Sequence, residues 1–228
     1  MANDKDFIVK NAVEVGGPTN VTLGTVTSIS PFNFLNISYE DKSLNVSSKE
    51  SNLGGGDISV DGTKFYVVGG VSDSVHQYNL STAFDLSTAS FTASFAFSQD
   101  GFCKDVKFKS DGTKMYLLGA DNNTIYQFSL STAWAVSTAS YDSVSFSHSS
   151  QSTVEQGLFF KPDGTKFYMV DNNGNIYQYS MSTSWNLSTA SYDSVSYTSL
   201  GNAKGITFNS EGNTFLLAIG DSTDYIKE

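Results

Sequence analysis

The feature that most constrains this chain is a turn-and-strand motif that recurs along it. The motif reads Asp-Gly-Thr-Lys followed by four apolar or aromatic residues and begins at Asp61, Asp111 and Asp163, with a decayed fourth copy at Glu211. Asp-Gly is a strong hairpin signal because glycine reaches positive φ without steric cost. The apolar run after it fits a strand that is buried on both faces. The copies begin about 50 residues apart, a spacing that indicates a repeat protein.

Each complete unit contains four strand-like segments. In the second unit these are residues 104–108, the apolar run up to residue 118, residues 124–130 and residues 141–147. The third segment alternates polar and apolar residues, as expected of a half-buried strand. We expect the blades to pack through residues of the apolar runs: Phe65, Tyr66, Met115, Tyr116, Phe167, Tyr168 and Phe215.

The two ends of the repeat complement each other. Tyr39 stands at the same distance before its Asp-Gly turn as Tyr141 does, and Phe32 then falls on the position of Trp134. A strand from the head of the chain therefore completes the last unit, which closes a ring and removes exposed sheet edges. The residues expected at this closure are Tyr39, Leu44, Val46, Tyr225 and Ile226.

The sequence thus predicts an all-β fold. Residues 31–228 are expected to form a four-bladed β-propeller of four-stranded antiparallel blades, closed by a strand over residues 39–48. The alternative is an eight-bladed ring built from two chains.

Residues 1–30 fall outside the repeat and contain two short strand-like segments separated by Gly16-Gly17-Pro18. An isolated two-stranded ribbon is marginal in water, so we expect it to dock on something. One interpretation is a terminus held against the domain. The one we adopt is an arm that anchors the protein or joins copies of it, through Phe7, Ile8, Val9, Val13 and Val15.

Two sequence signatures carry a family resemblance. An apolar strand, Pro-Asp-Gly-Thr-Lys and Phe-Tyr-Met-Val, over residues 160–170, resembles the blades of TolB-like, YVTN and NHL-like propellers. The segment Leu130 to Phe146 is similar to repeats in proteins of marine phages and bacteria, and residues 4–11 resemble the start of tail-fibre and structural proteins of tailed phages. The resemblance implies a virion setting.

Composition excludes several classes of function. The formal net charge is −10, and all 13 basic residues are Lys. Nucleic-acid recognition relies on clustered Arg and Lys, so we expect no nucleic-acid partner. Neither a signal peptide nor a stretch long enough for a transmembrane helix is found, so we expect synthesis in the host cytoplasm and no membrane insertion. Cys103 is alone and predicts no intrachain disulfide.

Catalytic candidates are sparse. Asp57 and Asp105 fall on the innermost strands and are the only pair we consider for glycoside hydrolysis, which needs two facing carboxylates. Single acids in so acidic a chain are expected to face solvent. His76 takes a position filled by Tyr in other units, and with His148 it builds no triad. We read Cys103 as a small buried residue.

Two groups of residues are candidates for ligand binding. The oxygen-rich loops at Asp121 and Asp171 are expected to serve as turns, with a weak Ca²⁺ site as the alternative and no other cofactor. Phe84, Trp134 and Trp185 recur once per unit between the third and fourth strands. We expect them to pack against the neighbouring blade; if exposed, they would be stacking platforms for sugar rings.

These observations favour a non-enzymatic virion structural protein of the fibre, appendage or decoration type. Its arm would bind other virion proteins or further copies of the chain, and its propeller would bind a host surface glycan or another virion protein. The alternatives are a polysaccharide-acting propeller enzyme that uses Asp57 and Asp105, and a bacterial protein–protein scaffold.

Overall fold

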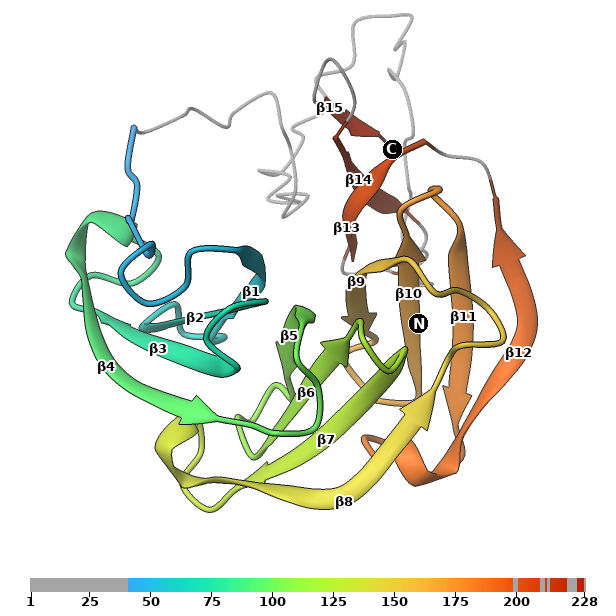
Figure 1. The fold of residues 1–228 in the computed structure, drawn as a ribbon, viewed down its shortest axis with the longest axis horizontal. Coiled ribbons are helices and arrows are strands. Elements are labelled where there is room, and N and C mark those ends of the chain that lie inside the picture. Colours follow the sequence, from blue (N-terminus) through green and yellow to red (C-terminus); the bar gives the residue numbers. More distant parts are fainter. Residues whose placement is uncertain (1–40, 199–200, 210–211, 213, 221–224, 228) are drawn as a thin grey trace, which may run out of the picture. The chain divides into compact units, whose positions relative to one another are not determined.

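The computed structural model describes residues 41–198, 201–209, 212, 214–220 and 225–227, all within the compact unit Ser38–Glu228. Residues 1–30, with the predicted arm, lie outside the described residues. The strands form four antiparallel sheets, here called blades one to four (Figure 1). Blade one contains β1 (Leu53–Ile58), β2 (Lys64–Gly69), β3 (Ser74–Leu80) and β4 (Ala89–Ala96). Blade two contains β5 (Cys103–Phe108), β6 (Lys114–Gly119), β7 (Thr124–Leu130) and β8 (Ala139–Ser147).

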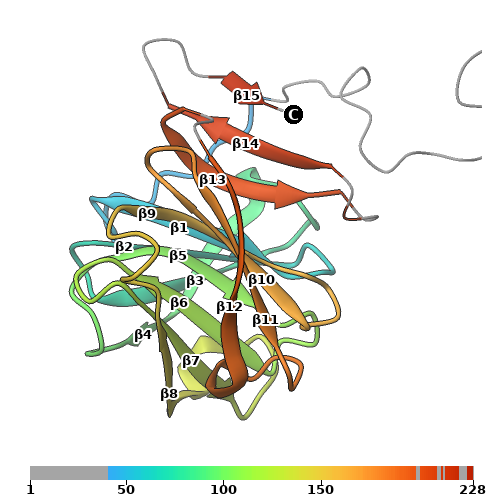
Figure 2. The same ribbon diagram turned by 90° about the vertical axis from the view of Figure 1, so that its right-hand side faces the viewer.

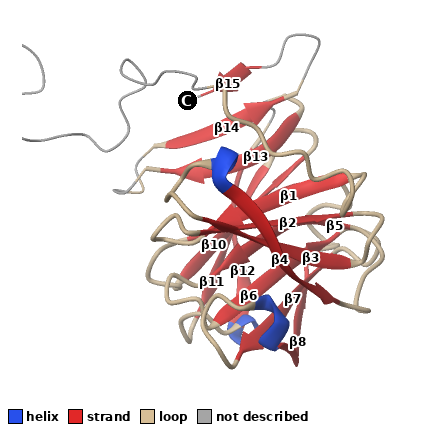
Figure 3. Ribbon diagram, turned by 90° about the vertical axis from the view of Figure 1, so that its left-hand side faces the viewer, coloured by secondary structure: helices blue, strands red, loops and turns tan. Residues whose placement is uncertain are grey.

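Blade three contains β9 (Glu155–Phe160), β10 (Lys166–Asp171), β11 (Ile176–Met181) and β12 (Ala190–Tyr197). Blade four contains β13 (Ala203–Phe208), β14 (Phe215–Ile219) and β15 (Tyr225–Lys227), and Figure 2 shows these three strands together. Helical structure in the described residues is limited to 3₁₀ turns between the third and fourth strands: η2 (Leu86–Thr88), η3 (Val136–Thr138) and η4 (Leu187–Thr189) (Figure 3).

The Asp-Gly turns produce the predicted hairpins. Gly62, Gly112 and Gly164 have φ of +69° to +72°. The aspartate before each glycine accepts hydrogen bonds from the backbone N–H and the hydroxyl of the following threonine, as Asp163 does from Thr165 at 2.9 and 2.7 Å. This side-chain bonding fixes the turn and hence the register of the first two strands in blades one to three.

The first strands lie side by side: β1 beside β5, β5 beside β9, and β9 beside β13, while β4, β8 and β12 lie at the periphery (Figure 1). A Cβ atom at Gly55 would lie 2.7 Å from the Lys104 carbonyl oxygen, which explains why this inner position takes glycine. Four antiparallel sheets arranged around their first strands make the fold a β-propeller.

The hydrophobic core lies between blades. One buried cluster joins blades one and two, a second joins blades two and three, and a third joins blades three and four. Of the predicted packing residues, Tyr66, Met115, Tyr116 and Phe167 are fully buried, and Phe65, Tyr168 and Phe215 are partly buried. Neighbouring blades therefore stabilise each other, as in other repeat proteins.

The predicted closing strand needs a correction. Leu44 and Val46 lie in residues 41–46, which form no strand, and the described part of blade four holds β13, β14 and β15 only. This segment contacts blade one, where Lys42 Nζ lies 3.0 Å from Asp85 Oδ2. The predicted partners Tyr225 and Ile226 lie in β15, and Tyr39 lies outside the described residues. Residues 41–46 pair with no described strand, and it is the pairing of backbone groups with a neighbour that defines a β-strand in a sheet.

Candidate functional site

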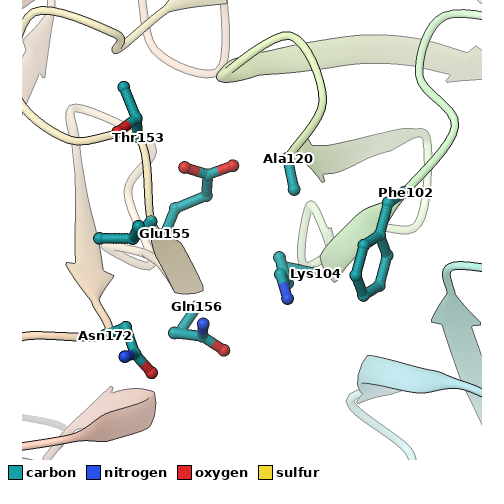
Figure 4. A pocket seen from close by; sticks show the side chains of 8 residues that line it. Phe102, Lys104, Ala120, Thr153, Glu155, Gln156 and Asn172 are labelled. Atoms are coloured by element: carbon teal, nitrogen blue, oxygen red, sulfur yellow. The ribbon is translucent and has the colours of Figure 1, made fainter.

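A pocket of about 310 Å³ lies between the starts of β5 and β9. Figure 4 shows its lining, in which Lys104 and Phe102 face Glu155 and Gln156 from opposite sides. Ligand pockets in proteins have volumes from about 300 Å³ upward, so this pocket has room for a small molecule. We call it the Glu155 pocket, and it is lined by Phe102, Lys104, Ala120, Thr153, Val154, Glu155, Gln156 and Asn172.

The repeat explains how these side chains meet. Lys104, Gln156 and Lys204 occupy the second position of β5, β9 and β13. Because these first strands lie side by side, the same position of each blade points into the same region. Lys104 Nζ lies 4.1 Å from the centre of the Phe102 ring, and Lys204 Nζ donates to Asn172 Oδ1 at 2.9 Å. Two ammonium groups from alternate blades therefore flank Gln156.

Glu155 is the unusual residue of the pocket. It takes a position held by Leu53, Cys103 and Ala203 in the other blades, and it is 1% exposed. Neither carboxyl oxygen accepts a hydrogen bond from any other described residue. Burial raises the pKa of Glu155 to about 7, because an unpaired charge in a buried place is poorly solvated. The group is thus a neutral acid at slightly acidic pH and can exchange a proton near pH 7.

The lysine opposite is shifted in the complementary direction. Burial lowers the pKa of Lys104, the neighbouring Glu155 opposes this shift, and the positive charge of Lys204 adds to it. A nearby anion stabilises the charged form of an ammonium group whose pKa is lowered by burial. The Glu155 pocket therefore combines a proton donor, a cation and several uncharged polar groups.

The predicted acids, Asp57 and Asp105, lie elsewhere and are fully bonded. Asp57 accepts hydrogen bonds from the backbone N–H of Ile58 and Phe108 at 2.9 and 2.8 Å. Asp105 likewise accepts from Val106 and Leu158, both at 2.9 Å. Each carboxylate thus links its own first strand to that of the next blade. They connect blades instead of facing each other across a substrate site.

Lys107 completes this connection. Its ammonium lies 2.8 Å from Asp105 Oδ1 and donates to the Gly56 carbonyl at 3.0 Å. Burial works against its charge, but the carboxylates of Asp105 and Asp57 outweigh it and hold the Lys107 pKa above its usual value. Burial raises the pKa of Asp57 to about 6. A buried ion-pair network produces these shifts. Such networks shift pKa values at structural sites as well as at active sites, so the shifts alone do not mark a catalytic group.

The recurring aromatics pack as expected in two of three blades. Trp185 is buried and Trp134 is half-buried, whereas Phe84 is 63% exposed. All three have φ between +61° and +65° and place the ring against the glycine of the Asp-Gly turn. Positive φ is rare for bulky residues, and the local sequence does not predict it.

The remaining predicted residues have local structural roles. Asp171 accepts hydrogen bonds within its own loop from the backbone N–H of Asn173 and Asn175, both at 2.9 Å. The Asp121 N–H donates to Asp100 at 3.0 Å. In the described part of the chain, no group of three His, Cys, Asp or Glu could hold a metal ion. No helix among those residues is long and apolar enough to cross a membrane.

The histidines and the cysteine are buried. His76 Nε2 lies 2.9 Å from Ser72 Oγ, which donates to Glu50 at 2.8 Å. In blade two the equivalent Tyr126 reaches Asp100 directly at 3.3 Å, so His76 substitutes for a tyrosine, as predicted. His148 is fully buried with its pKa lowered to about 4 by burial. Cys103 is fully buried, and burial raises its pKa.

Comparison with solved structures agrees with the propeller class. Proteins named "putative 6-phosphogluconolactonase" from Bacteroides uniformis and Bacteroides fragilis both match with a TM-score of 0.55, at 13% and 17% identity. They cover 81% and 75% of this chain, and the chain covers 53% and 48% of theirs. A functionally unknown protein from Desulfotomaculum acetoxidans matches at 16% identity with a TM-score of 0.52, over 73% of this chain and 49% of its own.

The chain therefore spans about half the length of the structures it matches, and the likeness shows the fold alone. No protein-family model matches the sequence, and no curated protein does. The resemblance to TolB-like, YVTN and NHL-like blades and to phage proteins stays a prediction.

Proposed function

We propose that this propeller binds a small polyhydroxylated anion of the sugar-acid class in the Glu155 pocket. The observation that supports this most directly is the buried carboxyl of Glu155, which accepts no hydrogen bond from the rest of the described chain. Leaving such a group unpaired costs about 1–3 kcal/mol. A ligand hydroxyl, which both donates and accepts, would satisfy it in either protonation state.

The other lining groups favour an anion with several hydroxyls. Lys104 and the nearby Lys204 supply two positive charges, and Glu155 is uncharged below about pH 7. Thr153, Gln156 and Asn172 add uncharged donors and acceptors, and the Phe102 ring offers an apolar face. A few polar groups around an apolar surface are typical of small-molecule sites.

A second candidate is an acid–base enzyme that acts on the same class of compound. The pKa of Glu155, about 7, is the value at which a carboxyl best serves as general acid and base. The names of the two Bacteroides proteins are consistent with a sugar-acid lactone as substrate. Two-carboxylate glycoside hydrolysis is disfavoured, because Glu155 is the one acid among the described residues that line the pocket.

The virion role inferred from the sequence remains a separate proposal, because it depends on residues 1–30. It is compatible with the pocket: an appendage that presents the Glu155 pocket would bind acidic sugars of a surface polysaccharide.

Titration calorimetry with gluconate and glucose tests the proposal. The two ligands differ mainly in the carboxylate, so gluconate is expected to bind at least 10-fold more tightly. Lys104→Met should weaken gluconate binding at least 10-fold, the effect of losing one charged hydrogen bond. Lys109→Met is the matched control, since Lys109 pairs with Asp111 at the turn and should not matter.

Absence of saturable binding, or equal affinity of wild type and Lys104→Met, would show the proposal to be wrong. The second candidate is tested with glucono-δ-lactone, whose hydrolysis in a pH-stat should exceed the rate in buffer alone. If the protein is an enzyme, the hydrolysis rate with the Glu155→Gln variant should fall to the rate in buffer alone. Binding without turnover supports the first candidate.

A further inference from the structure

In blade one, four polar side chains form a line of hydrogen bonds that ends at an exposed serine. Ser94 Oγ lies 2.7 Å from His76 Nδ1, and His76 Nε2 lies 2.9 Å from Ser72 Oγ. Ser72 Oγ in turn donates to Glu50 Oε2 at 2.8 Å. His76 and Glu50 are buried, whereas Ser94 lies on the outer strand β4 and is exposed (Figure 1). We call these four residues the His76 relay.

The partners determine which imidazole nitrogen carries the proton. Burial disfavours the charge of Glu50, but the hydrogen bonds that it accepts outweigh burial and lower its pKa, so this carboxylate is an acceptor only. Ser72 has one hydroxyl proton, which it donates to Glu50. His76 Nε2 therefore donates to Ser72 Oγ, and Nδ1 is left to accept the proton of Ser94. The imidazole is held in the tautomer that a general base for Ser94 requires.

The same surroundings keep the imidazole uncharged at neutral pH. Burial lowers the pKa of His76, the carboxylate of Glu50 opposes this shift, and the positive charge of Lys49 adds to it. A neutral imidazole accepts the proton of a serine hydroxyl, whereas an imidazolium has no free lone pair for it. His76 therefore combines the tautomer and the charge state of a base.

The other blades have the same serine without the base. Each outer strand of blades one to three places an exposed serine opposite the same residue of the third strand: Ser94 opposite His76, Ser145 opposite Tyr126 and Ser196 opposite Tyr177. Tyr126 donates its hydroxyl to the Asp100 carboxylate at 3.3 Å and has no basic nitrogen to offer the serine. Histidine in blade one thus keeps the connection to a buried acid, through Ser72, and adds a base beside the serine.

The surface around Ser94 is apolar and carries a positive charge. Phe91 pairs with Tyr78, two residues after His76 on β3, so its ring lies on the same face as Ser94. Phe91 is 42% exposed, and Lys49 Nζ lies 3.9 Å from the centre of its ring. An apolar group can therefore rest on Phe91, and a nearby cation favours negative charge that develops on a bound carbonyl oxygen.

We propose that Ser94 is an activated nucleophile that attacks carboxylic esters, with His76 as its general base. Ser94 Oγ forms a bond to the ester carbonyl carbon while its proton passes to His76 Nδ1. The bond from that carbon to the leaving oxygen then breaks, and the leaving oxygen takes the proton from Nδ1. Water next attacks the acyl group on Ser94 and gives its proton to Nδ1, and the Ser94 oxygen leaves with that proton.

This site is separate from the Glu155 pocket, because no residue of the His76 relay lines that pocket. The ester that fits it has an apolar acyl or leaving group, since the exposed surface beside Ser94 is the ring of Phe91. Binding of gluconate should not change in variants of the relay, so the two proposals succeed or fail independently.

Reaction of the full chain with p-nitrophenyl acetate tests the proposal. Release of p-nitrophenolate should exceed the rate in buffer, and peptide mass spectrometry of acid-quenched protein should place an acetyl group on Ser94. Ser145 and Ser196 are the matched controls within the same molecule and should stay unmodified. Ser94→Ala removes an exposed hydroxyl, so the protein should keep its circular dichroism spectrum and lose the excess release.

His76→Tyr introduces the residue of the other blades and should slow acetylation of Ser94 about 100-fold or more, as expected for loss of a general base. Ser72→Ala should also slow it, and Ser72→Thr, which keeps the hydroxyl, should restore the rate. Equal acetylation of the three serines, a wild-type rate in His76→Tyr, or release no faster than in buffer would each overturn the proposal. An acetyl group on His76 in place of Ser94 would do the same.

Discussion

Glu50 and Glu155 are both almost fully buried, yet their surroundings shift their pKa values in opposite directions. Glu50 accepts hydrogen bonds from the N–H of Asn52 and from the hydroxyl of Ser72, both at 2.8 Å. Burial acts against its charge, but these hydrogen bonds outweigh it and lower the pKa. At Glu155 the effect of burial outweighs that of its own backbone N–H and of the Lys104 charge, and the pKa rises to about 7. Burial alone therefore does not decide the charge of a carboxyl in this fold.

The shift at Glu155 predicts a pH-dependent cost. Its folded pKa, about 7, lies above the usual 4.5, so the folded protein holds the proton more tightly than the unfolded chain. This contribution to stability is complete below pH 4.5 and is lost as pH rises through 7. Glu155→Gln removes the titration, so its stability relative to wild type should improve by about 1–3 kcal/mol between pH 4.5 and 8. Urea unfolding at both pH values measures it.

Glu50→Gln is the matched comparison and should behave in the opposite way. A lowered folded pKa contributes stability above the unfolded value of 4.5, and this is lost as pH falls through the folded pKa. The variant should lose about 1–3 kcal/mol at pH 7, with a smaller loss at pH 3. Equal pH profiles for the two variants would contradict the assignment of both shifts.

At the scale of elements, the first strands are joined by charge as well as by packing. Asp105 bonds to the Leu158 N–H of the next blade and to the Lys107 ammonium, which in turn bonds to Gly56 of the previous blade. Three blades thus meet at one ion pair. Such a pair is expensive to break from one side, because the partner charge stays buried.

Asp105→Asn should therefore destabilise the protein by about 3–5 kcal/mol, measured by urea unfolding. The double variant Asp105→Asn with Lys107→Met removes both charges and should recover most of that loss. Binding of gluconate should not change in either variant, since neither residue lines the Glu155 pocket. A loss of affinity without a loss of stability would instead place Asp105 in the functional site.

The elements that the sequence predicts well are those with strong local signals. The Asp-Gly turns and the alternation in segments such as residues 124–130 were sufficient to locate the strands, because both depend on backbone geometry. The sequence did not predict a role for Glu155, because this residue stands at the start of a strand and neighbouring blades bury it. An alignment with Leu53, Cys103 and Ala203 would have revealed a lone acid at an apolar position.

Other features depend on contacts that local sequence does not encode. The positive φ of Trp134 contradicts its conformational preference, and it is sustained by the ring that rests on Gly112. The sequence predicts Asp57 and Asp105 to be surface acids. In the structure each carboxylate instead accepts a hydrogen bond from a backbone N–H of the following blade. The closing strand was placed by spacing alone, which determines a position in the repeat and not a pairing.

At the scale of the whole molecule, stability is shared between neighbours. Each hydrophobic cluster spans two blades, so no blade carries a complete core of its own. Among the described residues, blades one and four each share a buried cluster with one neighbour, whereas blades two and three each share clusters with two. Phe84, on blade one, is 63% exposed where Trp134 and Trp185 are covered by the preceding blade.

Deletion of residues 1–30 separates the role of the arm from that of the propeller. The truncated chain keeps all residues of the repeat, so its midpoint of thermal unfolding should stay within about 2 °C of the full chain, a change of at most about 1 kcal/mol. If the arm joins copies, light scattering should give the full chain a multiple of 24.6 kDa and the truncated chain the mass of one copy. Phe7→Ala and Val9→Ala in the full chain should weaken association in the same direction. A truncated chain that still associates would assign self-association to the propeller, and a full chain of single mass would remove self-association from the roles of residues 1–30.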